Sequence, residues 1–256
     1  AALKGHLEVV RFLVESGAKK DHGMTDGATP LHAAALRGHV EVVRCLVENG
    51  AKKDLGLTNN GNMPLHLAAQ AGQIEVVRFL VESGANKDGM TSGGATPLFI
   101  AAQEGHIEVV RCLVESGANK DHCQGRTDGS TPLVVAAARG HVEVVRFLVE
   151  SGANKDQCMA GGATPLFVAA LKGHVEVVRF LVESGANKDQ SQRDDGATPL
   201  HAAAQKGRID VVRFLVESGA NKDQGKTNGA TPLFQAALKG RIDVVRFLVE
   251  SGANKD

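Results

Sequence analysis

The sequence predicts a repeat solenoid in which α-helix predominates, and two observations carry this prediction. All seven prolines recur in one local context, 33 to 35 residues apart: Pro30, Pro64, Pro97, Pro132, Pro165, Pro199 and Pro232. Six of them lie in the tripeptide Thr-Pro-Leu, and the exception is Met63-Pro64-Leu65. A fixed period near 33 residues is typical of architectures in which each unit buries its apolar face against the next.

Each unit is predicted to hold two short helices, as the segment 27–54 illustrates. Thr29 suits the N-cap of the first helix, and Pro30 suits its first turn because no backbone hydrogen bond is lost there. Small apolar residues follow, and Gly38 ends the helix. A second apolar helical face runs from Val42 to Val47 and ends before Gly50. The polar, glycine-bearing segment 54–61 is then expected to be a turn or hairpin tip.

The repeated unit resembles the ankyrin repeat, whose pattern runs G-x-T-P-L-H-x-A-A-x-x-G-H-x-x-V-V. The resemblance covers residues 1–256 as a single array: a partial repeat at 1–21, then seven repeats of about 33–35 residues from 22 to 256. It implies a β-hairpin or loop and two antiparallel helices per unit. The sequence departs from the pattern after Pro-Leu, where histidine is kept in three repeats and replaced in four: His32, His66 and His201 against Phe99, Val134, Phe167 and Phe234.

Composition narrows the function classes. Lysine plus arginine equals aspartate plus glutamate, at 29 each, so bulk charge does not favour nucleic-acid binding. No apolar stretch is long enough to insert in a membrane. The four cysteines and the lack of glycosylation acceptors fit an intracellular compartment, cytoplasmic or nuclear. The chain begins without methionine or a signal peptide, so we interpret it as a piece of a longer protein, its ends covered by flanking repeats or neighbouring chains.

Variation between repeats indicates where a partner binds, because chemical diversity on a uniform scaffold is what recognition requires. In the ankyrin family the tips and one edge of the first helix line a concave partner-binding face. Apolar residues stand on successive tips here: Met24, Leu55, Leu57, Met90 and Met159. They predict either a contact surface for an apolar partner segment or side chains that fold back onto neighbouring tips.

A basic row forms the second candidate site. It lies just before the first helix stop and comprises Lys4, Arg37, Arg139, Lys172, Lys206 and Lys239. Ala71 and Glu104 interrupt it. The row suits an acidic partner segment, and the alternative is an edge that only aids solubility.

Sequence motifs for catalysis, phosphate binding or metal binding are weaker than these two candidate surfaces. Gly225-Lys226-Thr227 resembles the end of a phosphate-binding loop, but Ala220 stands where that loop needs a glycine. Cys123 and Cys158 occupy matching tips, without the ligand spacing of a metal site. We therefore expect no enzyme, no cofactor and no metal.

The sequence favours a protein-interaction module or scaffold. Two alternatives stay open. The array could be a structural packing subunit of a larger assembly, or the ankyrin portion of an enzyme or channel whose active domain lies outside this chain.

Overall fold

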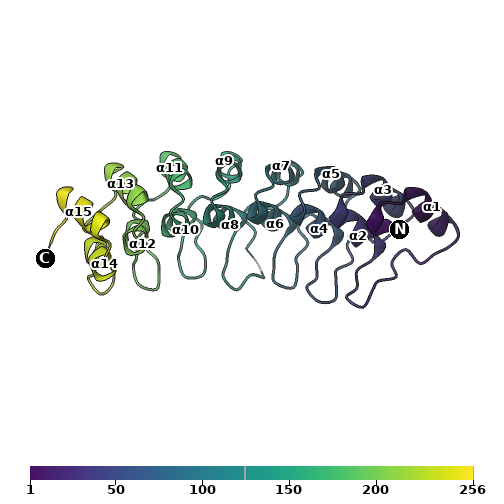
Figure 1. The fold of residues 1–256 in the computed structure, drawn as a ribbon, viewed down its shortest axis with the longest axis horizontal. Coiled ribbons are helices and arrows are strands. Elements are labelled where there is room, and N and C mark those ends of the chain that lie inside the picture. The colour runs from purple at the N-terminus through teal and green to yellow at the C-terminus, as the bar shows by residue number, and fades with distance from the viewer. Residues whose placement is uncertain (124, 256) are drawn as a thin grey trace. The chain divides into compact units, whose positions relative to one another are not determined.

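The computed structural model describes residues 1–123 and 125–255. Contacts between Cα atoms divide the chain into two compact units, residues 1–126 and 127–256. Within each unit the even-numbered helices form one row and the odd-numbered helices a second row, and the connecting loops extend beyond the even-numbered row (Figure 1). The predicted helical repeat architecture is confirmed in both units.

The first unit begins with a short 3₁₀ helix, η1 (Ala2–Lys4), and α1 (Leu7–Glu15). Three complete helix pairs follow: α2 (Pro30–Arg37) with α3 (Val40–Glu48), α4 (Pro64–Gln70) with α5 (Ile74–Glu82), and α6 (Pro97–Glu104) with α7 (Ile107–Glu115). Each even-numbered helix contacts the next one in its row, and the odd-numbered helices do the same.

The second unit holds four helix pairs of the same kind. They are α8 (Pro132–Arg139) with α9 (Val142–Glu150), α10 (Pro165–Lys172) with α11 (Val175–Glu183), α12 (Pro199–Lys206) with α13 (Ile209–Glu217), and α14 (Pro232–Leu238) with α15 (Ile242–Glu250).

The helix boundaries follow the predicted capping chemistry. At α2 the hydroxyl of Thr29 accepts a hydrogen bond from the backbone N–H of His32, and Pro30 stands in the first turn. Gly38 ends the helix with a φ of 75°, a left-handed conformation that glycine adopts without a side-chain clash. The same threonine cap and left-handed glycine recur at α6, α8, α10 and α12.

The core lies between the two helix rows of each unit. One leucine is fully buried in each of the helices α2 to α13 and in α15, as at Leu31 in α2 and Leu46 in α3. Alanines such as Ala34 and Ala35 are also fully buried, and their small side chains let neighbouring first helices approach closely.

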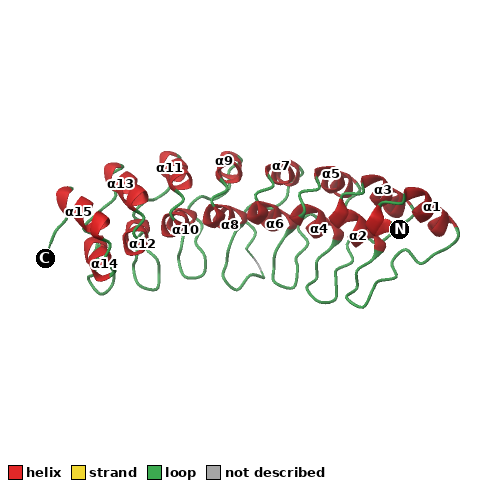
Figure 2. Cartoon of the chain, in the orientation of Figure 1, coloured by secondary structure: helices red, strands yellow, loops and turns green. Residues whose placement is uncertain are grey.

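The connections between repeats take the loop form of the two forms expected. No strand occurs in residues 1–123 or 125–255, where all regular structure is helical (Figure 2). The first tip closes with two backbone hydrogen bonds, from Met24 N to Ala28 O at 3.1 Å and from Gly27 N to Met24 O at 2.9 Å. One bond from Thr58 N to Asp26 O then joins it to the next tip. So few bonds make a turn rather than a ladder.

An aspartate ladder links successive repeats at the base of the loops. Asp21 Oδ1 accepts a hydrogen bond from Lys52 N at 2.9 Å, and Asp189 Oδ1 accepts one from Asn221 N at the same distance. The aspartate at this position of the repeat therefore bonds to the backbone of the next repeat.

Large exposed apolar side chains gather on η1 and α1 in the first unit and on α14 and α15 in the second unit. They are Leu3, Val9, Phe12 and Leu13, and Phe234, Leu238 and Ile242. At the repeat position of Val9, Val42 and Val76 are fully buried because a preceding repeat covers them.

Candidate functional site

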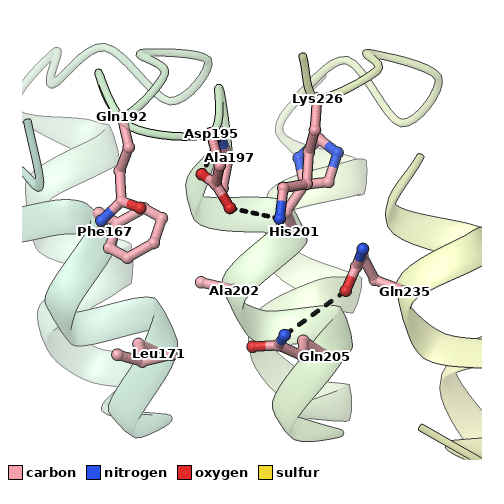
Figure 3. Close-up of a pocket in the computed structure, with 10 residues that line it drawn as sticks. All are labelled: Phe167, Leu171, Gln192, Asp195, Ala197, His201, Ala202, Gln205, Lys226 and Gln235. Atoms are coloured by element: carbon pink, nitrogen blue, oxygen red, sulfur yellow. Dashed lines mark hydrogen bonds and ion pairs between the residues drawn. The ribbon is translucent and has the colours of Figure 1, made fainter. Parts of the chain in front are cut away.

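A cavity of about 90 Å³ opens in the second unit between α10, α12 and the loops before α12 and α14 (Figure 3). One side of it is apolar, formed by Phe167, Leu171, Ala197 and Ala202. The other side is polar, and its residues are Gln192, Asp195, His201, Gln205, Lys226 and Gln235. A site that combines a small apolar floor with a few polar groups is suited to holding a side chain of a partner.

The cavity exists because Ala202 is small. The same repeat position holds a larger aliphatic residue in four other repeats: Leu67, Ile100, Val135 and Val168. The flanking walls come from Phe167 in the preceding repeat and Gln235 in the following one. The sequence shows that alanine replaces a branched residue at position 202. This change indicates a pocket only once the residues that wall it on either side are known.

The floor of the cavity is part of a buried apolar cluster. Ala163, Phe167, Ala197 and Ala202 form it, and Met159, Val168 and Leu171 pack against it. Phe167 stands at the position of the family's histidine, so the replacement supplies apolar surface beneath the cavity.

The polar rim is fixed by two interactions drawn in Figure 3. Lys226 Nζ forms an ion pair with Asp195 Oδ2, linking the loops before α14 and α12. Gln205 Nε2 donates a hydrogen bond to Gln235 Oε1 at 3.4 Å. The hydrogen bond from Lys226 lowers the pKa of Asp195, helped by the backbone N–H of Ala197. The Asp195 carboxyl is therefore ionised at neutral pH.

His201 is buried beneath the rim and has both ring nitrogens engaged. Its Nδ1 accepts from the backbone N–H of Thr198 at 3.2 Å, and its Nε2 donates to the carbonyl of Ala230 at 3.0 Å. Burial lowers the pKa of His201, so the ring is neutral at physiological pH. These bonds use the imidazole to position the loop and helix rather than to transfer protons.

The five apolar tip residues predicted from the sequence do not share one environment. Met24 and Met90 are exposed, at 71% and 44%, whereas Leu55, Leu57 and Met159 are half-buried. Met159 folds back onto the cavity floor, and the thioether of Met90 lies 3.2 Å from His122 Nε2.

All six residues of the basic row are exposed, at the C-terminal end of a first helix. In the second unit the row is unbroken, through Arg139, Lys172, Lys206 and Lys239. In the first unit Lys4 and Arg37 are followed by Ala71 and Glu104. A cation at the C-terminal end of a helix also interacts favourably with the partial negative charge there. Part of the row's role is therefore to stabilise its own helices.

The first unit carries a different hollow in the corresponding place. It has a volume of about 410 Å³ and includes Asn60, Gln103 and Glu104. The guanidinium of Arg126 lies 4.1 Å from the centre of the Phe99 ring within it. Glu104 of this hollow stands at the position that the basic row occupies in the second unit.

Other candidate chemistry has no support in the described residues. No cluster of three or more metal-ligating His, Cys, Asp or Glu side chains occurs there, and the four cysteines form no disulfide. Lys226 of the Gly-Lys-Thr segment belongs to the ion pair with Asp195. No helix in the part of the chain that the structure describes is long and apolar enough to cross a membrane.

Comparison with known proteins agrees with this repeat architecture. Sequence models of ankyrin repeats (3 copies) match residues 1–91, 53–124, 98–192 and 186–256. The crystal structure of the human ASB11 ankyrin repeat domain is similar, with 32% identity and a TM-score of 0.80. The match covers 90% of this chain and 100% of that one. The comparison with curated proteins found no match. The chain belongs to the ankyrin repeat family.

Proposed function

We propose that this chain is a protein-interaction module that binds a partner through its recognition face, meaning the even-numbered helices and the loop tips. Ankyrin repeats are in general protein-binding modules. The observation that carries the proposal is the cavity at Ala202, because it lies on this face and is open to a partner side chain. In the second unit the basic row adds charged surface, and in the first unit the exposed tips of Met24 and Met90 offer apolar surface.

The odd-numbered helices are poor candidates for specificity. Their sequences are nearly identical from repeat to repeat, as the segments VEVVRFLVE and IEVVRFLVE illustrate. Their polar groups also contact one another, as Arg11 Nη1 and Glu8 Oε1 do at 3.3 Å. Exposed pairs of this kind contribute little free energy, about 0.2–1 kcal/mol, and they recur along the array.

The proposal is tested by affinity capture from a lysate of the source cells with quantitative mass spectrometry. One bait carries Met24→Ser and Met90→Ser, a second carries Lys172→Glu and Lys206→Glu, and a control carries Glu41→Gln and Glu75→Gln on the odd-numbered helices. We expect the parent and the control to retain the same partner and at least one recognition-face variant to lose it. Loss only in the control would instead support a packing subunit that buries its odd-numbered helices.

We also propose that the exposed apolar faces at Phe12 and Phe234 contact a further repeat, supplied by flanking chain or by a neighbouring copy. Sedimentation velocity over a hundredfold range of concentration tests the second source. Association that Phe234→Ser abolishes supports contact between copies, and a concentration-independent monomer contradicts it.

A further inference from the structure

We infer that the second unit binds an extended acidic segment of a partner protein that places one aliphatic side chain in the cavity at Ala202 and carboxylates along Arg139, Lys172, Lys206 and Lys239. The inference rests on the proposed function and specifies the chemistry of the partner. Three features of the second unit support it: the shape of the cavity, the distribution of charge and the spacing of the helices.

The cavity suits a small aliphatic side chain. Its volume of about 90 Å³ is about three times the space one water molecule takes in the liquid. Phe167, Leu171 and Ala202 offer apolar contact, while Asp195 and Lys226 already neutralise each other at the mouth. The amides of Gln205 and Gln235 remain at the rim, where they can exchange their weak 3.4 Å bond for bonds to a peptide backbone.

The two units differ in the charge that they carry on this face. Every first helix of the second unit ends in a cation, whereas the first unit has Ala71 and Glu104 at two of the four positions. At the next position, just after the helix stop, the second unit has two further cations. Its residues there are His141, His174, Arg208 and Arg241, against His6, His39, Gln73 and His106 in the first unit. Arg208 Nε and Arg241 Nε donate to carbonyls of the preceding first helix, at 3.5 Å and 3.3 Å. Both guanidinium groups therefore lie beside the basic row and reinforce its charge.

Helix spacing sets the spacing of the partner's carboxylates. Packed helices lie about 8–10 Å apart, and an extended chain advances about 3.3 Å per residue. A segment that crosses the row of first helices therefore moves from one cation to the next in about three residues. Because Leu171 and Gln205 line the cavity and directly precede Lys172 and Lys206, the aliphatic residue belongs between the two middle carboxylates.

A synthetic peptide tests the inference directly. The probe is a fluorescein-labelled peptide of sequence ESTELLETSE, which has glutamate at every third position and reads the same in both directions. One control, SSEEEELLTT, keeps the composition but clusters the charge. A second, ESTESSETSE, removes the leucines. Binding to the full chain is measured by fluorescence anisotropy at 50 mM and 300 mM salt.

The protein variants have matched controls within the same chain. Ala202→Ile fills the cavity with a side chain that the scaffold already holds at Ile100, and Ala33→Ile makes the same change at the equivalent position of the first unit. Lys172→Glu with Lys206→Glu reverses the row in the second unit, and Lys4→Glu with Arg37→Glu reverses it in the first. Circular dichroism and thermal melting of each variant establish that it is folded.

We expect the parent to bind the probe at least tenfold more tightly than either control peptide, and more weakly at 300 mM salt. Ala202→Ile should weaken binding at least fivefold and the double reversal in the second unit at least tenfold, with both first-unit variants within twofold of the parent.

Equal affinity for the clustered peptide, an unchanged affinity in Ala202→Ile, or no binding at 1 mM protein would each overturn the inference. So would displacement of the probe by a mixed-sequence single-stranded DNA 20-mer that binds more tightly, because the row would then serve nucleic acid. If the probe fails while affinity capture still depends on the recognition face, the interaction module stands and only this partner chemistry is wrong.

Discussion

The imidazole of His201 joins α12 to the loop of the following repeat, because its Nε2–H donates to the carbonyl of Ala230 at 3.0 Å. His66 makes the same kind of link from α4, donating to the carbonyls of Gly89 and Ala95 at 3.0 and 3.1 Å. His32 donates to the carbonyl of Asn62 at 3.1 Å. Three of the seven complete repeats are therefore tied to the next one through a buried ring.

These histidines predict acid sensitivity of the fold. Burial lowers the pKa of each ring below 6.5, so the unfolded chain binds more protons than the folded chain once the pH falls below 6.5. Their contribution to stability is complete above pH 6.5 and is lost as the pH falls from 6.5 through the folded pKa values. Urea denaturation at pH 7.5 and 5.5 measures the loss.

A triple variant, His32→Phe with His66→Phe and His201→Phe, serves as the control because phenylalanine already occupies this position in three repeats. It should be less stable than the parent at pH 7.5 and change less between the two pH values. Asp195 does not contribute in this window, since the pKa of its carboxyl is lowered from 3.8. An equal pH response in parent and variant would contradict the assignment.

A second prediction concerns the stacking of arginine on phenylalanine between successive odd-numbered helices. Arg179 Cζ lies 4.6 Å from the centre of the Phe214 ring, and Arg44 Cζ lies 4.5 Å from that of Phe79. At Cys112 the ring is missing beneath Arg78. Cys112→Phe should raise the free energy of unfolding by about 0.5–1 kcal/mol, the usual strength of an exposed cation–π contact. Cys112→Leu restores apolar volume without the ring, and an equal gain there would assign the effect to packing alone.

A third prediction separates backbone strain from loop packing at two glycines. Gly152 and Gly162 have φ values of 85° and 86°. A β-carbon at Gly162 would lie 2.6 Å from the backbone nitrogen of Arg193, whereas nothing lies within 4 Å at Gly152. Gly152→Ala should therefore cost only the conformational penalty of about 1–2 kcal/mol. Gly162→Ala should cost at least 1 kcal/mol more, because the loop before α12 must shift as well. Chemical denaturation of both variants measures the difference.

A fourth prediction tests the cap of α12. The hydroxyl of Thr198 bonds to the backbone N–H of His201 and lies 2.8 Å from its Nδ1. Thr198→Val keeps the volume but removes the hydroxyl, and it should lower the free energy of unfolding by about 0.5–2 kcal/mol. Thr198→Ser keeps the hydroxyl and should stay within about 0.5 kcal/mol of the parent. Thermal melting distinguishes the two, and equal losses would mean that the methyl contact dominates.

The repeat architecture could be predicted from the sequence because its causes are local. Thr29, Pro30 and Gly38 act within one helix, through a cap, a permitted proline and a left-handed turn. The period of the prolines then extends this result along the chain. The sequence left the tips open between hairpins and loops, because turn-favouring composition alone does not distinguish the two. The tips form turns with few backbone bonds.

The candidate site was harder to predict because its walls come from three repeats. Ala202 reads as one more alanine until Phe167 and Gln235 are brought to its sides from 35 residues before and 33 residues after. The charges on the odd-numbered helices show the same limit. Arg44 and Glu41, which stand three residues apart in α3, form an ion pair at 3.9 Å that this spacing explains. The guanidinium of Arg44 also lies over Phe79 of the next repeat, which spacing within one helix does not reveal.

The aspartate ladder bears on how the array would respond to mechanical force. These carboxylates accept a hydrogen bond from the backbone of the repeat that follows, as Asp54 does from Asn86 N and Asp223 from Asn254 N. Tension applied along the chain would therefore act on every link in the series, together with the leucines buried between the helix rows. A repeat pulled out of the array would release about 33 residues, which span about 110 Å when fully extended. We expect the array to lengthen under load in steps of about this size.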